Sequence, residues 1–102
     1  MIALLETKRE AIAKVCARYG VTRLEAFGSA LGNDFNPENS DLDLLVELGP
    51  MDAYARVDAY FGMLDELRVL LNQKIDLVMV GAVKNPYIAR NIELTKQLLY
   101  AV

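Results

Sequence analysis

Two aspartates, Asp41 and Asp43, open a run of aliphatic residues that extends to Leu48. Aspartate is depleted from strands because it packs poorly on a pleated surface and prefers turns. Side chains two residues apart in a strand point to the same face, so the two carboxylates would lie about 6–7 Å apart along the strand. The pair is therefore either a solvated strand entrance or a group with a chemical task, and an isolated Asp-x-Asp pattern does not decide between them.

A third carboxylate, Asp76, stands near the start of a later aliphatic run, residues 75–80. The intervening residues 52–72 have helical periodicity, so we expect a strand–helix–strand unit with parallel strands and a right-handed crossover. The starts of both strands then lie at one edge of the sheet, and Asp76 faces the first pair in a suitable register. Three carboxylates there repel one another unless a cation lies among them. Mg²⁺ is the natural candidate, because it binds through a few carboxylates together with substrate phosphates.

A Gly28-Ser29 turn follows the short run of residues 23–27. That run is expected to be a strand antiparallel to residues 42–48, which would bring the turn close to Asp41. Glycine lets a phosphate approach the backbone closely, amides of a following helical turn can hold the phosphate, and the serine adds a hydroxyl donor. The turn is a candidate phosphate site beside the carboxylates, although a Gly-Ser pair alone is equally typical of a plain loop.

Taken together, these groups are those that nucleotidyl transfer requires. In this chemistry two metal ions clamp the triphosphate and the incoming hydroxyl, and they stabilise both the attacking and the leaving oxygen. We expect Asp41 and Asp43 to be ligands of both metals. We expect Asp76 to complete the metal site that activates the nucleophile and to assist its deprotonation.

The composition narrows the class of protein. The chain has 102 residues, which suits one domain spanning 1–102, and its net charge of −3 argues against a free-standing nucleic-acid binder. It has no histidine and one cysteine, Cys16, which excludes Ser-His or Cys-His catalysis, the usual zinc ligands and an intrachain disulfide. The N-terminus is charged too early for a signal peptide, and no apolar run is long enough to cross a bilayer. We expect a cytoplasmic protein without membrane association.

The elements that position the candidate residues follow from the spacing of apolar side chains. We predict helices over 3–19 and 52–72 and strands over 23–27, 42–48 and 75–80, with a turn and loop over 29–40 that includes one helical turn near Ser29–Gly32. A last helix begins with Asn85 as N-cap and Pro86 at its first position and runs to about Lys96, before a short strand over 98–100. This order predicts an α/β or α+β fold, in which a small mixed sheet is flanked by helices.

Each of the two long helices has an apolar face that we predict to be buried. The two faces comprise Leu5, Ile12, Val15, Cys16 and Tyr19 on the first helix and Val57, Tyr60, Leu64, Leu67 and Leu71 on the second. The acidic residues Asp58, Asp65 and Glu66 are predicted to form the solvated side of the second helix. Asp34, Glu38 and Asn39 fall in the loop before the aspartate pair, where a residue could contact a nucleotide.

With these motifs in this order, the chain resembles the minimal nucleotidyltransferase domain of the DNA polymerase β superfamily. The family pattern is Gly-Ser, a second glycine, and then Ser-Asp-x-Asp-Leu followed by aliphatic residues. The matching residues are Gly28, Ser29, Gly32, Ser40, Asp41, Asp43 and Leu44, and the third family carboxylate matches Asp76. The resemblance covers nearly the whole chain and implies the polymerase-β-like nucleotidyltransferase fold. It also implies that the three aspartates are catalytic metal ligands and that Gly28, Ser29 and Ser40 bind the nucleotide.

The resemblance further implies a partner and a reaction. Small stand-alone domains of this family are typically the antitoxin half of a two-gene module, whose other half is an all-helical HEPN-domain protein, often an RNase toxin. Family members can transfer AMP from ATP to a tyrosine of that toxin and silence it, and two Mg²⁺ ions are the expected cofactors. The expected assembly is a hetero-oligomer with the toxin, or a homodimer, without direct contact to nucleic acid.

The chain departs from the family pattern at one place. The family usually has a basic residue just after Gly-Ser, and this chain has Ala30 and Leu31 instead. A missing cation near the triphosphate predicts a weaker activity, unless Lys74, Lys84 or Arg90 supplies the charge. The alternative function is therefore a non-catalytic antitoxin that neutralises the HEPN partner by binding alone. A further alternative is nucleotidyl transfer to a small molecule, as in the related aminoglycoside-modifying enzymes, which usually carry an additional domain for the acceptor.

Overall fold

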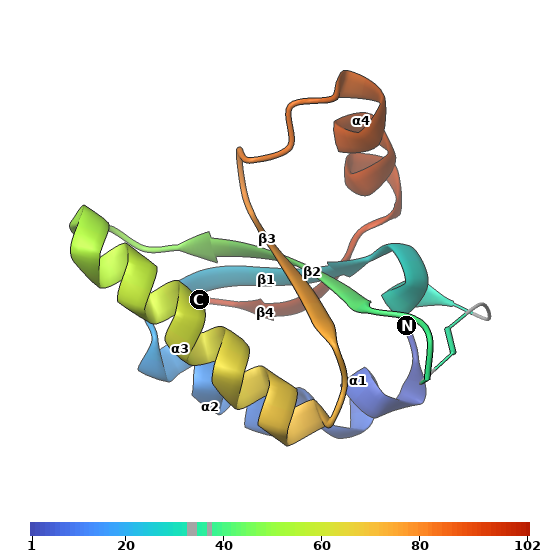
Figure 1. Cartoon of the computed structure of the whole chain (residues 1–102), viewed down its shortest axis with the longest axis horizontal. Helices are drawn as coiled ribbons and strands as arrows, with labels where there is room; N and C mark the ends of the chain where they lie inside the picture. Colours follow the sequence, from blue (N-terminus) through green and yellow to red (C-terminus); the bar gives the residue numbers. More distant parts are fainter. Residues whose placement is uncertain (33–34, 37) are drawn as a thin grey trace.

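A computed structural model describes residues 1–32, 35–36 and 38–102 of the chain. The predicted loop residue Asp34 lies outside the described residues. In chain order the elements are α1 (Ala3–Thr7), α2 (Arg9–Arg18), β1 (Val21–Phe27), the 3₁₀ turn η1 (Gly28–Leu31), β2 (Leu42–Leu48), α3 (Ala53–Leu71), β3 (Ile75–Met79), α4 (Pro86–Thr95) and β4 (Gln97–Ala101) (Figure 1). Within these residues, none of the helices combines the length and apolar character that crossing a bilayer requires.

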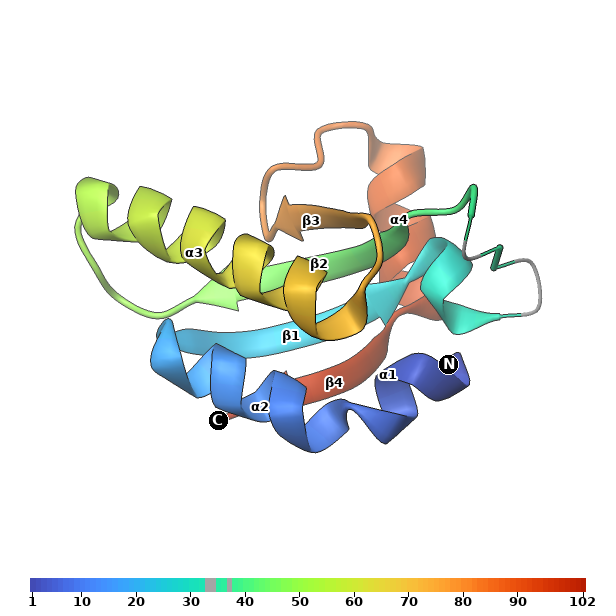
Figure 2. The ribbon, with the colours of Figure 1, turned by 60° about the horizontal axis from the view of Figure 1, so that its bottom comes forward.

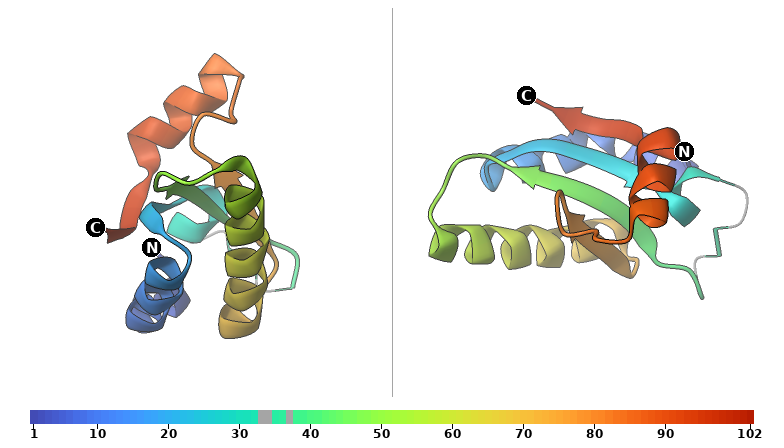
Figure 3. Two further views of the ribbon diagram at one scale, coloured as in Figure 1. Left: turned by 90° about the vertical axis from the view of Figure 1, so that its left-hand side faces the viewer. Right: turned by 90° about the horizontal axis from the view of Figure 1, so that it is seen from above.

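The strands form a mixed sheet in the order β3-β2-β1-β4 (Figure 2). β2 and β3 are parallel, as the strand–helix–strand pattern predicts, and β1 is antiparallel to both β2 and β4. Helices α1, α2 and α3 cover one face of this sheet, whereas α4 stands on the opposite side (Figures 1 and 3). The predicted fold class, a small mixed sheet flanked by helices, is confirmed.

The hydrophobic core lies between the sheet and the three helices α1, α2 and α3. It takes alternate residues of β1, β2 and β3, which include Leu24, Ala26, Leu42, Leu44, Val46, Ile75 and Leu77. The predicted apolar face of the first helical segment is confirmed, since Leu5, Ile12, Val15 and Cys16 are buried and Tyr19 is half-buried. The other side of the sheet carries the intervening residues Glu25, Asp43, Leu45 and Asp76, and we call it the open face.

The predicted buried face of α3 is wrong at one position. Leu64, Leu67 and Leu71 are buried, but the Val57 side chain is 55% exposed. With Phe61, Val57 lines a surface cavity beside β3, which is an edge strand. Tyr60 is half-buried there, and its hydroxyl donates to the Leu77 carbonyl at 2.5 Å.

The predicted helix over residues 3–19 is divided into α1 and α2 at Lys8, whose φ and ψ are −96° and 8°. The guanidinium of the next residue, Arg9, donates to the carbonyls of Leu98 and Leu99 at 3.1 and 3.3 Å. Arg9 therefore covers outward carbonyls of the edge strand β4, so the break accompanies a tertiary contact that the helical periodicity does not contain.

The predicted start of the last helix is confirmed. The Asn85 side chain accepts hydrogen bonds from the amides of Tyr87 and Ile88, and Pro86 occupies the first helical position. Asp52 caps α3 in the same way by accepting from the Ala55 amide at 2.8 Å. Such caps satisfy amides that have no partner within the helix, so each helix has a defined start.

Candidate active site

Two of the three predicted site aspartates lie side by side on the open face. β2 and β3 pair in parallel with Asp43 opposite Asp76, so both side chains point away from the core. Asp41 lies two residues before Asp43, immediately ahead of β2, and both Asp41 and Asp76 are exposed. The crossover through α3 therefore places the three carboxylates at one edge of the sheet, as the sequence predicts.

The Gly28-Ser29 turn faces Asp43, because β1 ends opposite it with Phe27 paired to Asp43. The Ser29 amide and hydroxyl donate to Asp43 Oδ2 at 3.3 and 3.2 Å. The hydroxyl also lies 2.5 Å from the Asp41 carbonyl oxygen. The turn thus presents its donors to an anionic oxygen, which is the interaction that a phosphate group would make there.

Gly28 is required by the backbone conformation and by the available space. Its φ is +58°, in the left-handed region that side chains disfavour, and a Cβ at this position would lie 2.5 Å from Asp43 Oδ2. The glycine therefore allows the first residue of η1 to approach the carboxylate closely. A bulkier residue would push the Ser29 donors away from Asp43.

Burial raises the pKa of the Asp43 carboxyl above its usual range. The hydrogen bonds from Ser29 act in the opposite direction, and the negative charges of Asp76 and Asp41 add to the increase. An ionised Asp43 is thus partly desolvated beside two like charges, an arrangement that a bound cation would stabilise.

The chemistry of the donors fits Mg²⁺, because every candidate ligand is a carboxylate or hydroxyl oxygen. Among residues 1–32, 35–36 and 38–102, however, no three His, Cys, Asp or Glu side chains are gathered closely enough to hold a metal ion. Asp43 is instead turned toward Ser29 by the hydrogen bonds described above. Metal binding would therefore require side-chain rotation at Asp41, Asp43 or Asp76.

Ser40 has a different environment from Ser29. Its hydroxyl accepts from the Asn36 amide at 3.1 Å, and its own amide donates to the Asn36 carbonyl at 2.7 Å. These bonds close a turn in the loop just before Asp41, so Ser40 contributes to the conformation from which β2 begins.

The positions after Gly28-Ser29 provide no positive charge, since Ala30 is buried in the core and Leu31 packs against it. Lys74 lines a polar cavity of about 650 Å³ that also includes Asp41 and Arg68. The Lys84 ammonium donates to the Gly81 carbonyl at 3.1 Å. Lys74 thus shares a cavity with a site aspartate, which makes it a candidate to replace the family cation.

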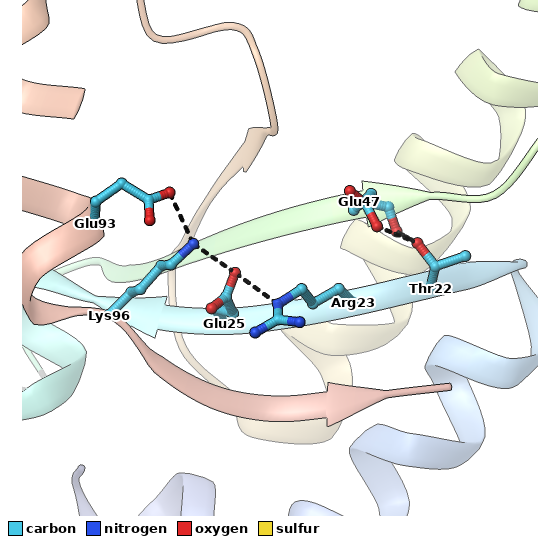
Figure 4. A network of polar contacts seen from close by, with 6 residues as sticks. All are labelled: Thr22, Arg23, Glu25, Glu47, Glu93 and Lys96. Carbon is cyan, nitrogen blue, oxygen red and sulfur yellow. Dashed lines mark hydrogen bonds and ion pairs between the residues drawn. The ribbon is translucent and has the colours of Figure 1, made fainter. Parts of the chain in front are cut away.

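A fourth carboxylate on the open face, Glu25, is not signalled by the sequence. It is only 3% exposed, and it lies opposite Leu45, two residues along β2 from Asp43. Arg23 and Lys96 hold it at 3.2 and 3.3 Å (Figure 4). In the sequence, Glu25 alternates with apolar residues as any polar strand residue would, and its burial results from the contact with Lys96 at the end of α4.

Comparison with known structures defines the class of protein. A solved structure described as "Structure of putative minimal nucleotidyltransferase" superposes with a TM-score of 0.72 at 31% identity, over 91% of this chain and 93% of that one. A chain from the complex of a tri-AMPylated Shewanella oneidensis HEPN toxin with an MNT antitoxin superposes with a TM-score of 0.63 at 18% identity, over 96% and 73%. The fold is that of a minimal nucleotidyltransferase, so the predicted fold is confirmed.

Sequence comparison gives the family. Residues 8–99 match the family described as "Nucleotidyltransferase domain". A Methanocaldococcus jannaschii protein named "Putative protein adenylyltransferase MJ0128" is 41% identical over 83 residues, which are 81% of this chain and 79% of that protein. The chain belongs to the nucleotidyltransferase domain family, and the predicted enzyme class is confirmed.

Proposed function

We propose that this chain transfers AMP from ATP to the hydroxyl of a tyrosine of a partner HEPN toxin, with release of pyrophosphate, and thereby neutralises the toxin. The observation that carries the proposal is the pairing of Asp43 with Asp76 on parallel strands, with the Gly28-Ser29 turn in hydrogen-bond contact with Asp43. This arrangement supplies carboxylates for a divalent metal and donors for a phosphate within one small area. It therefore supports transfer of a nucleotide rather than binding alone.

The comparisons support the choice of reaction and partner. The relative at 41% identity is named as an adenylyltransferase acting on protein. The superposed antitoxin belongs to a complex with a HEPN toxin that carries AMP groups. A complex of this chain with such a toxin is the assembly that the proposal requires.

The residues of the site have distinct tasks in this proposal. Asp41, Asp43 and Asp76 would hold Mg²⁺, which would supply positive charge for the attacking and leaving oxygens. The Ser29 amide and hydroxyl, released from Asp43, donate to a phosphate oxygen, and Gly28 permits its approach. Ser40, whose hydroxyl accepts from the Asn36 amide in the loop ahead of Asp41, binds the nucleotide together with Ser29. Asp76 assists removal of the proton from the tyrosine hydroxyl.

The direct test is incubation of the chain with ATP labelled in the α-phosphate, Mg²⁺ and the purified HEPN partner. The wild-type chain should label the partner, whereas the double variant Asp41→Asn with Asp43→Asn should lose about 100-fold or more of the rate. Asp58→Asn is the matched control, because Asp58 is exposed on α3 and should leave the rate unchanged. Absence of transfer, or equal transfer by the double variant, contradicts the proposal.

Two observations favour a second function, neutralisation of the partner by binding alone. Within the described residues no three-carboxylate metal group is assembled, and Ala30 and Leu31 replace the usual cation. If binding alone is sufficient, Asp43→Ala should still neutralise the toxin in a growth-rescue assay. If Asp43→Ala binds the partner but fails to neutralise it, this second function is excluded.

A further inference from the structure

A small cavity lies between α4 and the open face of the sheet. Its volume is about 190 Å³. The side chains that line it come from β2, from the segment after β3 and from α4, and they are Leu45, Val80, Val83, Ala89, Ile92 and Glu93. The cavity is therefore apolar on its walls and has one carboxylate at its margin.

The cavity is on the same face as the candidate phosphate site and close to it. Leu45 lies two residues along β2 from Asp43, a distance of about 7 Å along the strand. In Figure 3, α4 stands above the sheet near the end where β2 begins. A nucleotide with its phosphates at Ser29 and Asp43 can therefore reach the cavity without leaving the open face.

The size of the cavity restricts what can occupy it. Pockets that enclose whole small molecules commonly have volumes of about 300–1,000 Å³. A cavity of about 190 Å³ is below this range, so it can take a flat fragment but not a complete nucleotide. A nucleobase has the matching character, with apolar faces and polar groups along its edge.

An ion pair between Lys96 and Glu25 joins the end of α4 to the sheet (Figure 4). The Lys96 ammonium lies 3.3 Å from Glu25 on β1 and 2.9 Å from Glu93 on α4. Ile92 is the buried residue of α4, so the helix has little apolar contact with the rest of the chain. The ion pair between Lys96 and the buried Glu25 is therefore a main connection between α4 and the sheet. It fixes the distance of α4 from the sheet and with it the size of the cavity.

We propose that this cavity receives the adenine base of ATP, and that the Glu25–Lys96 pair positions α4 for that contact. The proposal rests on the nucleotidyl-transfer function proposed above. Leu45 and Ile92 contact the faces of the base, and Glu93 accepts a hydrogen bond from its amino group. The sugar spans the open face between the cavity and Asp43.

The test compares ATP with inorganic tripolyphosphate, which has the phosphates but no base. Dissociation constants of both are measured by titration calorimetry with Mg²⁺ for the wild-type chain, Ala89→Phe and Leu94→Phe. Ala89→Phe fills the cavity and should weaken ATP binding about tenfold or more while leaving tripolyphosphate unchanged. Leu94→Phe is the matched control, because it places the same ring on the exposed side of α4 and should behave as wild type.

A measurement on the unaltered chain guards against a folding defect in Ala89→Phe. With methyl groups labelled for NMR, ATP should shift the resonances of Ile92 and Leu45 through the ring current of the base. Tripolyphosphate should not shift them, and the core residue Leu44 should respond to neither ligand. If Ala89→Phe weakens the binding of both ligands equally, the resonance shifts in the wild-type chain show whether the base occupies the cavity.

The outcomes separate the two proposals. If the wild-type chain binds ATP no more tightly than tripolyphosphate, or if Ala89→Phe binds ATP normally, the base site is wrong and the proposed function stands. If the wild-type chain binds neither ligand, the proposed function fails and the base site fails with it.

Discussion

The two faces of the sheet use alternate residues of the same strands in different ways. In β2, Leu42, Leu44 and Val46 enter the core under three helices, whereas Asp43 and Leu45 point to the open face. The helix-covered face is continuous apolar packing. The open face combines paired carboxylates, an ion pair with a buried Glu25 and a small cavity beneath one weakly attached helix.

The two faces therefore have different tasks: one supplies most of the folding free energy, and the other carries the candidate site. Burial of apolar surface is the main source of folding free energy, and it is concentrated on the helix-covered face. Asp43, in contrast, is partly desolvated beside like charges, which opposes folding. The core on one face therefore has to offset the unfavourable electrostatics that the candidate site on the other face requires.

The largest expected effect on stability comes from truncating two neighbouring residues of β2 that point to opposite faces of the sheet. Leu44→Ala should lower the free energy of unfolding by about 2–5 kcal/mol, because Leu44 is fully buried in the core. Leu45→Ala should cost about 1–2 kcal/mol, since Leu45 already borders a cavity. Urea unfolding followed by circular dichroism measures both, and equal losses would contradict the difference between the faces.

The next effect concerns the ion pair that holds α4. Lys96→Met should cost about 1–3 kcal/mol, because it leaves the buried Glu25 carboxylate with Arg23 alone. The double variant Lys96→Met with Glu25→Leu should recover most of this loss, since two apolar groups can replace a buried pair. Lys84→Met is the control, and a double variant no more stable than the single one would show that the pair does not connect α4 to the sheet.

Glycine substitutions in η1 and just after it should have a smaller effect on stability and a large effect on activity. Gly28→Ala should cost about 1–2 kcal/mol for its positive φ and should displace Asp43. Gly32→Ala should be tolerated, because a Cβ there meets nothing within 4 Å in the described part of the chain. Thermal unfolding and the AMP-transfer assay together test this pair, and equal activity of the two variants would exclude close approach at Gly28.

The smallest expected effect on stability concerns Glu66, on the solvent-facing surface of α3. Hydrogen bonds from Tyr19 and Arg18 hold the pKa of the Glu66 carboxyl below its usual value. Because the pKa of Glu66 is lower in the folded chain than in the unfolded one, its ionised carboxylate stabilises the fold. This contribution is fully present above the unfolded-state pKa of about 4.3 and is lost as the pH falls through the lowered pKa of the folded state. Glu66→Gln should therefore lower the melting temperature slightly at pH 7 and not at pH 3. A difference independent of pH would show that ionisation of Glu66 is not involved.

The sequence predicted the positions of the site aspartates because their placement follows from local rules. Asp41 and Asp43 stand two residues apart at the start of β2, and the crossover through α3 brings Asp76 opposite Asp43. Gly28-Ser29 was predicted to lie close to Asp41 because residues 23–27 were expected to pair antiparallel with residues 42–48, as β1 and β2 do. Their roles in metal and nucleotide binding stay predictions that the transfer assay tests.

Other features could not be obtained from periodicity. Val57 has the spacing of a buried residue but is exposed, because it borders an open cavity beside the edge strand β3. The break at Lys8 accompanies a contact between Arg9 and β4, which is about 90 residues later in the chain. Periodicity identifies residues that share a face, but it does not identify what covers that face.

By itself, the sequence determined the alternation of the strands and the start of the last helix at Asn85. It also contains, in order, the motifs by which the chain resembles the nucleotidyltransferase family. These properties depend on neighbours a few positions apart, so they are visible in one dimension. The tertiary structure alone decided that Glu25 is buried by Lys96 and that α4 encloses a cavity beside Asp43. Those features arise where distant segments meet, and the free energy of such contacts depends on the folded chain as a whole.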